Sequence, residues 1–170
     1  ATDQNFMNNG DASYFVENDK VRFTDEATTF KVELVGDLPC DTVFVDNTKA
    51  YTFSGSGAIT GHATLVKTGT GRLNITTDNT YTGGNRLSGG VVSVSSLSNA
   101  NQAHGNLGGV TTKPTDFIME NGAVLQTSAA VQMGSPIRFE GEEGGSINNS
   151  ADFAMNKAFS GTVLTKSGGG

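Results

Sequence analysis

The sequence predicts an all-β protein and, among all-β folds, a parallel β-solenoid. Two features favour this fold: apolar and polar residues alternate in short runs along the chain, and apolar positions in its centre recur at a constant spacing. A β-sandwich or jelly roll is the alternative, because strands of similar length and spacing produce some of the same regularity by chance.

The alternation has a period of two, which places successive side chains on opposite faces of a strand. It is clearest at 30–34, 43–45, 51–53, 73–75 and 92–94. Gly, Asn and Asp, the residues that turns favour, separate these runs. We therefore expect strands joined by tight turns over most of the chain.

The constant spacing is 22 residues, close to the length of one coil of a parallel β-solenoid with three short strands and their corners. Stacked coils would place such side chains above one another in continuous columns. The pairs that share the spacing are Val43–Leu65, Tyr51–Leu73, Phe53–Ile75, Ile59–Tyr81, Leu65–Leu87 and Gly61–Gly83.

Composition excludes several kinds of partner. The chain has 170 residues, a net charge of −6 and 11 scattered basic residues, whereas binding to nucleic acid requires clustered Lys and Arg. No apolar run approaches the ~20 residues of a membrane-spanning helix. Cys40 is the single cysteine, so no disulfide can form within the chain. We expect no nucleic-acid partner and no membrane insertion by this segment.

No pattern of residues indicates catalysis or metal binding. His62 and His104 lack further ligands at the short spacing that a metal site needs, and there is no G-x-S-x-G nucleophile elbow. The carboxylates at 140–143 are interpreted as a solvated turn rather than a catalytic pair. We predict no enzyme activity, no catalytic residue, no cofactor and no metal. A polysaccharide lyase or hydrolase is kept as a third hypothesis.

Four residues are candidates for contacting a ligand. Tyr14 and Tyr51 offer rings on which a sugar could stack, and Asp78 and Asn79 offer oxygen and amide groups at a turn. Core packing of the tyrosines and turn hydrogen bonding by the Asp and Asn are the alternative explanations.

One segment, residues 64–94, carries a spaced motif. Its pattern is L-x-K-x-G-x-G-x-L-x-I, then N-x-Y-x-G-G, then a final strand. We expect the aliphatic side chains to point inward, the glycines to form corners, the Tyr to fill a corner and the Asn to bond backbone groups. A partial second copy, L-x-K-S-G, lies at 161–170. The motif residues are Leu65, Lys67, Gly69, Gly71, Leu73, Ile75, Asn79, Tyr81, Gly83, Gly84, Val92 and Val94.

This motif resembles the autotransporter-associated β-strand repeat, also called the passenger-associated transport repeat. Arg72 and Asn85 depart from the usual pattern, in which a small polar residue and Thr are common, without disturbing the inward positions. The resemblance covers about 30 contiguous residues.

The resemblance implies a right-handed parallel β-helix in an exported bacterial protein, and hence a secreted or cell-surface location. It brings no catalytic residues. It favours a structural spacer that aids export, with other domains of the same longer chain as partners. The motif is also similar to modules appended to secreted glycan-degrading proteins, so a carbohydrate-binding module with a polysaccharide partner is the alternative function.

The expected organisation has two parts. Residues 1–20 form an N-terminal lead-in or cap. Residues 21–170 form the solenoid, with the repeat motif at 64–94 and a truncated second copy at 161–170.

Overall fold

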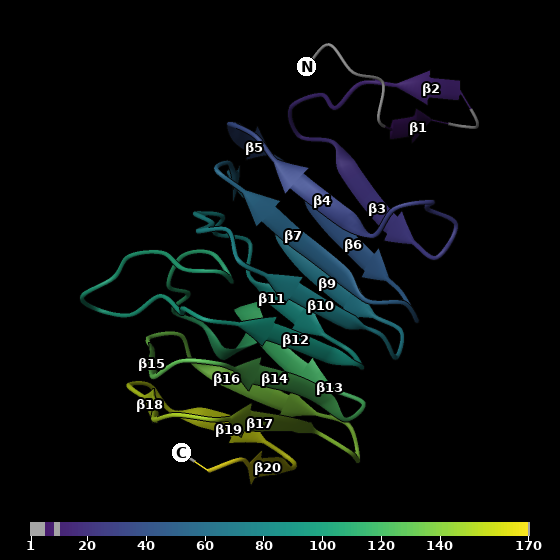
Figure 1. The fold of residues 1–170 in the computed structure, drawn as a ribbon. Coiled ribbons are helices and arrows are strands. Elements are labelled where there is room, and N and C mark those ends of the chain that lie inside the picture. Colours follow the sequence, from purple (N-terminus) through teal and green to yellow (C-terminus); the bar gives the residue numbers. More distant parts are fainter. Residues whose placement is uncertain (1–5, 9–10, 170) are drawn as a thin grey trace.

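The computed structural model describes residues 6–8 and 11–169. Over these residues the chain winds through seven coils, each passing in turn through two large sheets (Figure 1). The predicted all-β solenoid is confirmed: the described strands of both large sheets pair in parallel, whereas the alternative sandwich would require antiparallel sheets.

The first large sheet takes one strand from every coil. In coil order its strands are β3 (Lys20–Thr24), β6 (Thr42–Asp46), β9 (Thr64–Thr68), β11 (Asn85–Leu87), β13 (Phe117–Glu120), β16 (Ile137–Glu140) and β19 (Phe159–Gly161).

The second large sheet follows the same order. Its strands are β4 (Lys31–Leu34), β7 (Tyr51–Gly55), β10 (Arg72–Ile75), β12 (Val91–Val94), β14 (Ala123–Thr127), β17 (Gly145–Asn149) and β20 (Leu164–Ser167).

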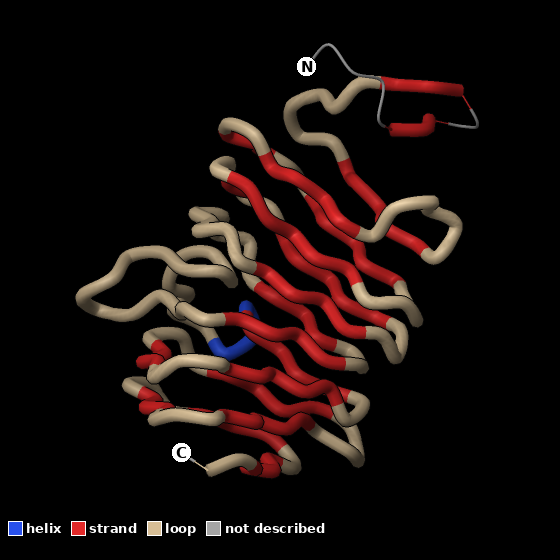
Figure 2. The backbone as a smooth tube through the Cα atoms, viewed as in Figure 1, coloured by secondary structure: helices blue, strands red, loops and turns tan. Residues whose placement is uncertain are grey.

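The third side of the coils is less regular, as the tube in Figure 2 shows. It holds two pairs of short parallel strands, β5 (Asp37–Pro39) with β8 (Ala58–Thr60), and β15 (Val131–Met133) with β18 (Phe153–Met155). Loops fill the gap between these pairs, together with the short 3-10 helix η1 (Pro114–Asp116). No helix among the described residues is long and apolar enough to cross a membrane.

The register confirms three of the six predicted pairs: Val43–Leu65, Tyr51–Leu73 and Phe53–Ile75 lie directly opposite each other. The two pairs on the third side, Ile59–Tyr81 and Gly61–Gly83, are wrong, because the Thr82 amide donates to the carbonyl oxygen of Gly61 and so places Tyr81 beside Gly61. The pair Leu65–Leu87 is also wrong: Leu65 lies opposite Asn85, and Leu87 lies opposite Lys67. The chain needs only 20 residues (85 − 65) to return to the first sheet at this coil, because its third side is shorter.

Coil length varies more further along the chain. Asn85 lies opposite Phe117, so this coil takes 32 residues (117 − 85). The extra length is a loop over residues 95–113, here called the insertion loop, which projects from the third side (Figure 1). The next strand of the first sheet returns to a spacing of 20, from Ile118 to Arg138.

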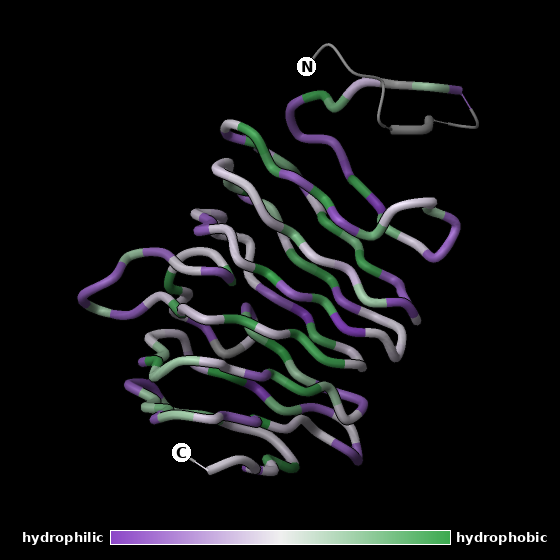
Figure 3. Tube along the Cα trace, in the orientation of Figure 1, coloured by the Kyte–Doolittle hydropathy of each residue, from purple (hydrophilic) through white to green (hydrophobic). Residues whose placement is uncertain are grey.

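Inward side chains form one continuous core that runs the length of the stack. Figure 3 shows the apolar residues alternating along the strands. Tyr51, Leu73, Val92 and Leu125 occupy one such column in the second sheet, and all four are buried. Full burial of each apolar side chain stabilises the fold by about 1.5–3 kcal/mol.

The N-terminal segment lies at one end of the stack. Its described part contains an antiparallel pair, β1 (Phe6–Asn8) with β2 (Asp11–Ser13), and Phe15 packs against the core. Residues 1–5 and 9–10 of the predicted lead-in lie outside the described residues. Regular solenoid structure begins with β3 at Lys20, and the role of 1–20 as a cap stays a prediction.

The partial second copy of the motif lies in a different sheet from the first. Leu65 and Lys67 belong to β9 of the first sheet, whereas Leu164 and Lys166 belong to β20 of the second. The two segments therefore do not occupy equivalent places in successive coils. Both are followed by a positive-φ glycine, Gly69 and Gly168, and Gly170 lies outside the described residues.

Cys40 is buried, and burial, with a further contribution from the charge of Asp19, raises the pKa of its thiol to about 11. At pH 8 the thiolate fraction is then about 100-fold lower than for a thiol of pKa 9, because each pKa unit is a factor of ten. We expect iodoacetamide to label native Cys40 at least that much more slowly than the chain in urea, as measured by mass spectrometry. Equal rates in the two states would contradict this burial.

Candidate functional site: the repeat segment and the insertion loop

The first half of the repeat motif forms the two main strands of coil three. Leu65 and Lys67 point inward from β9, and Leu73 and Ile75 point inward from β10. All four side chains are buried. The residues opposite them in coil two are Val43, Val45, Tyr51 and Phe53.

Lys67 is a fully buried cation in an apolar column, between Val45 and Leu87. Its Nζ donates to the carbonyl oxygens of Thr68 at 2.5 Å and Gly69 at 3.1 Å. The motif lysine therefore binds the carbonyls of the corner that follows its own strand. Burial lowers the pKa of Lys67 to about 8, and the carboxylates of Asp46 and Asp25 oppose this shift in part.

The lowered pKa predicts a specific dependence of stability on pH. Between about pH 8 and 10.5 the unfolded chain keeps a proton on Lys67 that the folded chain has released, so the free energy of unfolding rises with pH. Below pH 8 this group contributes no pH dependence. In urea titrations, we expect the free energy of unfolding of the wild type to increase relative to that of Lys67→Met between pH 7.5 and 9.5.

Comparison with the variant removes the contributions of other groups, such as Cys40, that titrate in the same range. The exposed Lys31 provides a control, because Lys31→Met should keep the pH dependence of the wild type. A constant difference between wild type and Lys67→Met across this pH range would contradict the assignment.

At the corner after β9, two glycines of the motif pack closely against Asn47 of coil two. Gly69 has a φ of +72°, and a Cβ there would lie 2.3 Å from the carbonyl oxygen of Asn47 in the coil above. A Cβ on Gly71 would lie 2.6 Å from Nδ2 of the same Asn47. That Nδ2 donates to the carbonyl oxygens of Lys49 and Arg72, so Asn47 ties two coils together. Both motif glycines are needed because the corners of successive coils touch.

The Asn of N-x-Y organises the third side of coil three. Asn79 is buried, and its Oδ1 accepts from the amide of Ile59 at 2.9 Å and from Thr77 Oγ1 at 3.2 Å. Its Nδ2 donates to the carbonyl oxygens of Asn106 at 2.7 Å and Thr77 at 3.3 Å. One amide thus links coil two, coil three and the insertion loop.

Asn106 completes this connection from the side of the insertion loop. Its Nδ2 donates to the carbonyl oxygen of Thr77 at 2.9 Å. Its Oδ1 accepts from the amides of Ser95 and Ser96 at 2.8 and 2.9 Å. Because Asn106 is itself buried, the base of the insertion loop is held by satisfied hydrogen bonds away from water.

The Tyr of the motif makes the next connection. Tyr81 is buried, and its hydroxyl donates to Asn85 Oδ1 at 2.7 Å. Asn85 Nδ2 in turn donates to the carbonyl oxygen of Leu107 in the insertion loop at 3.1 Å. Burial raises the pKa of Tyr81 strongly. Asn85 is therefore a second link between the motif and this loop, beside Asn79.

The end of the motif closes the coil and begins the next. A Cβ on Gly83 would lie 2.2 Å from the carbonyl oxygen of His62, and one on Gly84, whose φ is +90°, would lie 2.0 Å from that of Asp116. Val92 and Val94 then point inward from β12, with Val92 opposite Leu73. The motif thus supplies two strands of coil three and the first two of coil four.

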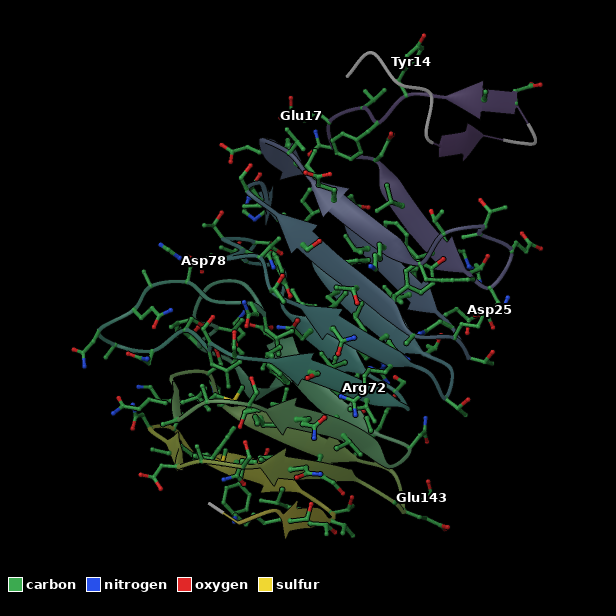
Figure 4. The ribbon with its side chains drawn as sticks, in the orientation of Figure 1. Tyr14, Glu17, Asp25, Arg72, Asp78 and Glu143 are labelled. Carbon is green, nitrogen blue, oxygen red and sulfur yellow. The ribbon has the colours of Figure 1, made fainter. Side chains whose placement is uncertain are left out.

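The four predicted ligand contacts do not come together. Tyr51 is 1 % exposed with its hydroxyl donating to the carbonyl oxygen of Thr24 at 2.6 Å, and Asn79 is buried in the network above. Protein groups hydrogen-bond the polar atoms of both side chains. Tyr14 is exposed on the N-terminal segment, and Asp78 is exposed on coil three (Figure 4).

Asp78 has a partner in the insertion loop. Its Oδ2 lies 2.7 Å from Nδ1 of His104. Beside this pair, an open depression of about 530 Å³ lies between the insertion loop and coil three. Its lining includes Thr80, Thr82, Asn99, Ala103, His104 and Val110.

Sequence reasoning missed two of these roles. Lys67 lies two residues after Leu65, so the period of two could have placed its side chain on the same inward face. Asn106 carries no comparable signal, because it lies 27 residues after Asn79, outside the 22-residue spacing. No group of three His, Cys, Asp or Glu among the described residues could hold a metal ion.

Parts of the chain are similar to one protein family and to one further protein. Residues 65–94 match the sequence model of the family described as Passenger-associated-transport-repeat. The chain is also 32 % identical over 87 residues to a protein named Adhesin BmaC autotransporter from Brucella suis biovar 1 (strain 1330). This similarity covers 46 % of the chain and 2 % of the relative's length. No solved structure matches the chain significantly.

The matched residues coincide with the strands and corners described above, from Leu65 on β9 to Val94 at the end of β12. Residues 65–94 of this chain are a passenger-associated transport repeat, set within a parallel β-solenoid.

Proposed function

We propose that this chain is a non-catalytic structural spacer within a longer secreted or cell-surface bacterial protein, and that it aids the export of that protein. The repeat and the solenoid fold support a structural module of a passenger domain. The observation that carries the proposal is the unbroken register of seven strands in each large sheet. The stack spans about 29 Å, because six steps of about 4.8 Å separate seven strands.

Two further observations support a structural role. The polar motif residues bind backbone groups rather than facing a cleft: Lys67 binds the corner that follows its own strand, and Asn79 binds coil two and the insertion loop. The partners of this spacer, as we propose it, are the other domains of the same longer chain. The relative's printed name, an autotransporter adhesin, supports an exported location.

A display experiment tests the spacer and export proposals. The chain is placed between an epitope tag and an autotransporter translocator in a Gram-negative host, and surface tag is measured by flow cytometry. We expect more surface tag with this chain than with a Gly/Ser linker of equal length. Asn79→Ala should remove this increase in surface tag, whereas the surface variant Asn74→Ala should keep it. Equal display by the flexible linker would overturn the export role.

The absence of catalysis is tested separately. Incubation of the purified chain with polygalacturonate, xylan and related polysaccharides should release no new reducing ends and no unsaturated products. Either product, if it persists after purification of the chain to homogeneity, would overturn the non-catalytic part of the proposal.

A further inference from the structure

We propose that the depression between the insertion loop and coil three binds a neutral saccharide. This site goes beyond the spacer role, which does not require it. It lies where the loop projects from the stack, next to the labelled Asp78 (Figure 4).

The depression has preformed walls. One wall is the segment 80–82, stacked on coil two through hydrogen bonds from the amides of Thr80 and Thr82 to Ile59 and Gly61. The other wall is the insertion loop, which is fixed to the same segment by the bond from the Gly109 amide to the Tyr81 carbonyl oxygen at 2.9 Å. The buried Asn79–Asn106 connection holds its base. A ligand therefore binds without first ordering the loop, which lowers the entropic cost of binding.

The polar groups in the depression are those that recognise hydroxyls. Nδ1 of His104 lies 2.7 Å from Asp78 Oδ2, which leaves its other ring nitrogen, Nε2, available to a ligand. Thr80, which also lines the depression, is an exposed residue. A hydroxyl both donates to and accepts from a sugar hydroxyl, and an imidazole nitrogen does one or the other according to whether it carries a proton.

The rest of the lining combines polar Thr82 and Asn99 with small apolar residues. Ala100, Ala103 and Val110 provide a surface for the C–H face of a sugar ring, and Val110 is 37 % exposed. No Lys, Arg, Asp or Glu lines the depression, and the chain carries a net charge of −6. An anionic saccharide would meet no Lys or Arg and would lie close to the carboxylate of Asp78, so the lining favours a neutral one.

The test is a microarray of neutral and acidic oligosaccharides probed with the purified chain, followed by titration of the hits. Neutral gluco-, xylo-, manno- and galacto-oligosaccharides form one arm, and uronates and sialylated glycans form the other. We expect the chain to bind oligosaccharides of the neutral arm alone. His104→Ala should weaken this binding about tenfold, because one or two hydrogen bonds are lost. Ala103→Trp should abolish it, because the larger side chain fills the depression.

Two matched variants control for surface changes elsewhere. Ala154→Trp places the same bulk on an exposed position of β18, on the same side of the stack, and Gln102→Ala removes an exposed polar side chain of the loop outside the lining. Both should bind as the wild type does.

Three outcomes would overturn the proposal: no neutral glycan bound at millimolar concentration, binding that survives Ala103→Trp, or binding restricted to acidic glycans. None of them alters the display result, so failure of this site and failure of the spacer role are distinguishable.

Discussion

Replacing Asn79 with alanine should lower the free energy of unfolding by about 4 kcal/mol. The Ile59 amide and the Asn106 carbonyl lose their partner in a buried environment, and each unsatisfied group costs about 1–3 kcal/mol. Urea denaturation measures the loss. Hydrogen exchange should also rise in the insertion loop, because Asn79 holds its base.

Asn74→Ala is the matched control, since Asn74 is on the preceding strand and faces outward. Its amide makes only long bonds, at 3.3 and 3.4 Å, to coil two. We expect its replacement to change stability by about 0.5 kcal/mol or less. Similar losses in the two variants would mean that Asn79 does not connect the coils as described.

Replacing Gly69 with alanine should cost about 3 kcal/mol. Two effects add there: a φ of +72°, which costs about 1–2 kcal/mol for an L residue, and a Cβ placed 2.3 Å from the carbonyl oxygen of Asn47, which forces the two corners apart. Thermal or urea unfolding of the purified variant measures the sum.

Gly36 separates these two effects. Its φ is +70°, close to that of Gly69, but a Cβ there meets nothing within 4 Å. Gly36→Ala should therefore show the conformational cost alone, about 1 kcal/mol. Equal losses of stability in the two variants would contradict the claim that close contact between corners of successive coils requires glycine at position 69.

Much of the fold follows from local pattern. Alternation at 43–45 and 73–75 places one face of each strand inside, and a parallel stack repeats that face from coil to coil. The pairs Tyr51–Leu73 and Phe53–Ile75 were predictable because coils two and three have the same length between those strands.

Corner and loop lengths were not predictable in this way. Strands fix which face is inward, whereas loops absorb insertions without disturbing the ladder. Leu87 consequently lies over Lys67 rather than Leu65, and the coil that begins at Asn85 carries the insertion loop. The similar segments 64–68 and 164–167 lie in different sheets, because alternation says nothing about which sheet a strand joins.

The candidate site was predicted only in part. Asp78 was identified as a polar residue at a turn, but its partner His104 lies on a loop with no periodic signal. Tyr51 and Asn79 were assigned either to a ligand or to the fold, through core packing for Tyr51 and turn hydrogen bonding for Asn79, and both side chains are buried. Polar residues inside a solenoid are difficult to recognise from sequence, since they bind backbone groups of coils that are distant in the chain.

Each coil of the solenoid adds one strand spacing to the stack, whatever its length in residues. Spin labels on outward positions of one column of the second sheet test this directly, because Lys31, Gln126 and Ser167 belong to coils one, five and seven of that column. Pulsed electron paramagnetic resonance should give about 19 Å between the labelled backbone positions 31 and 126 and about 29 Å between 31 and 167, four and six steps of about 4.8 Å. Distances that are broad, or that do not increase from the first pair to the second, would contradict a continuous stack.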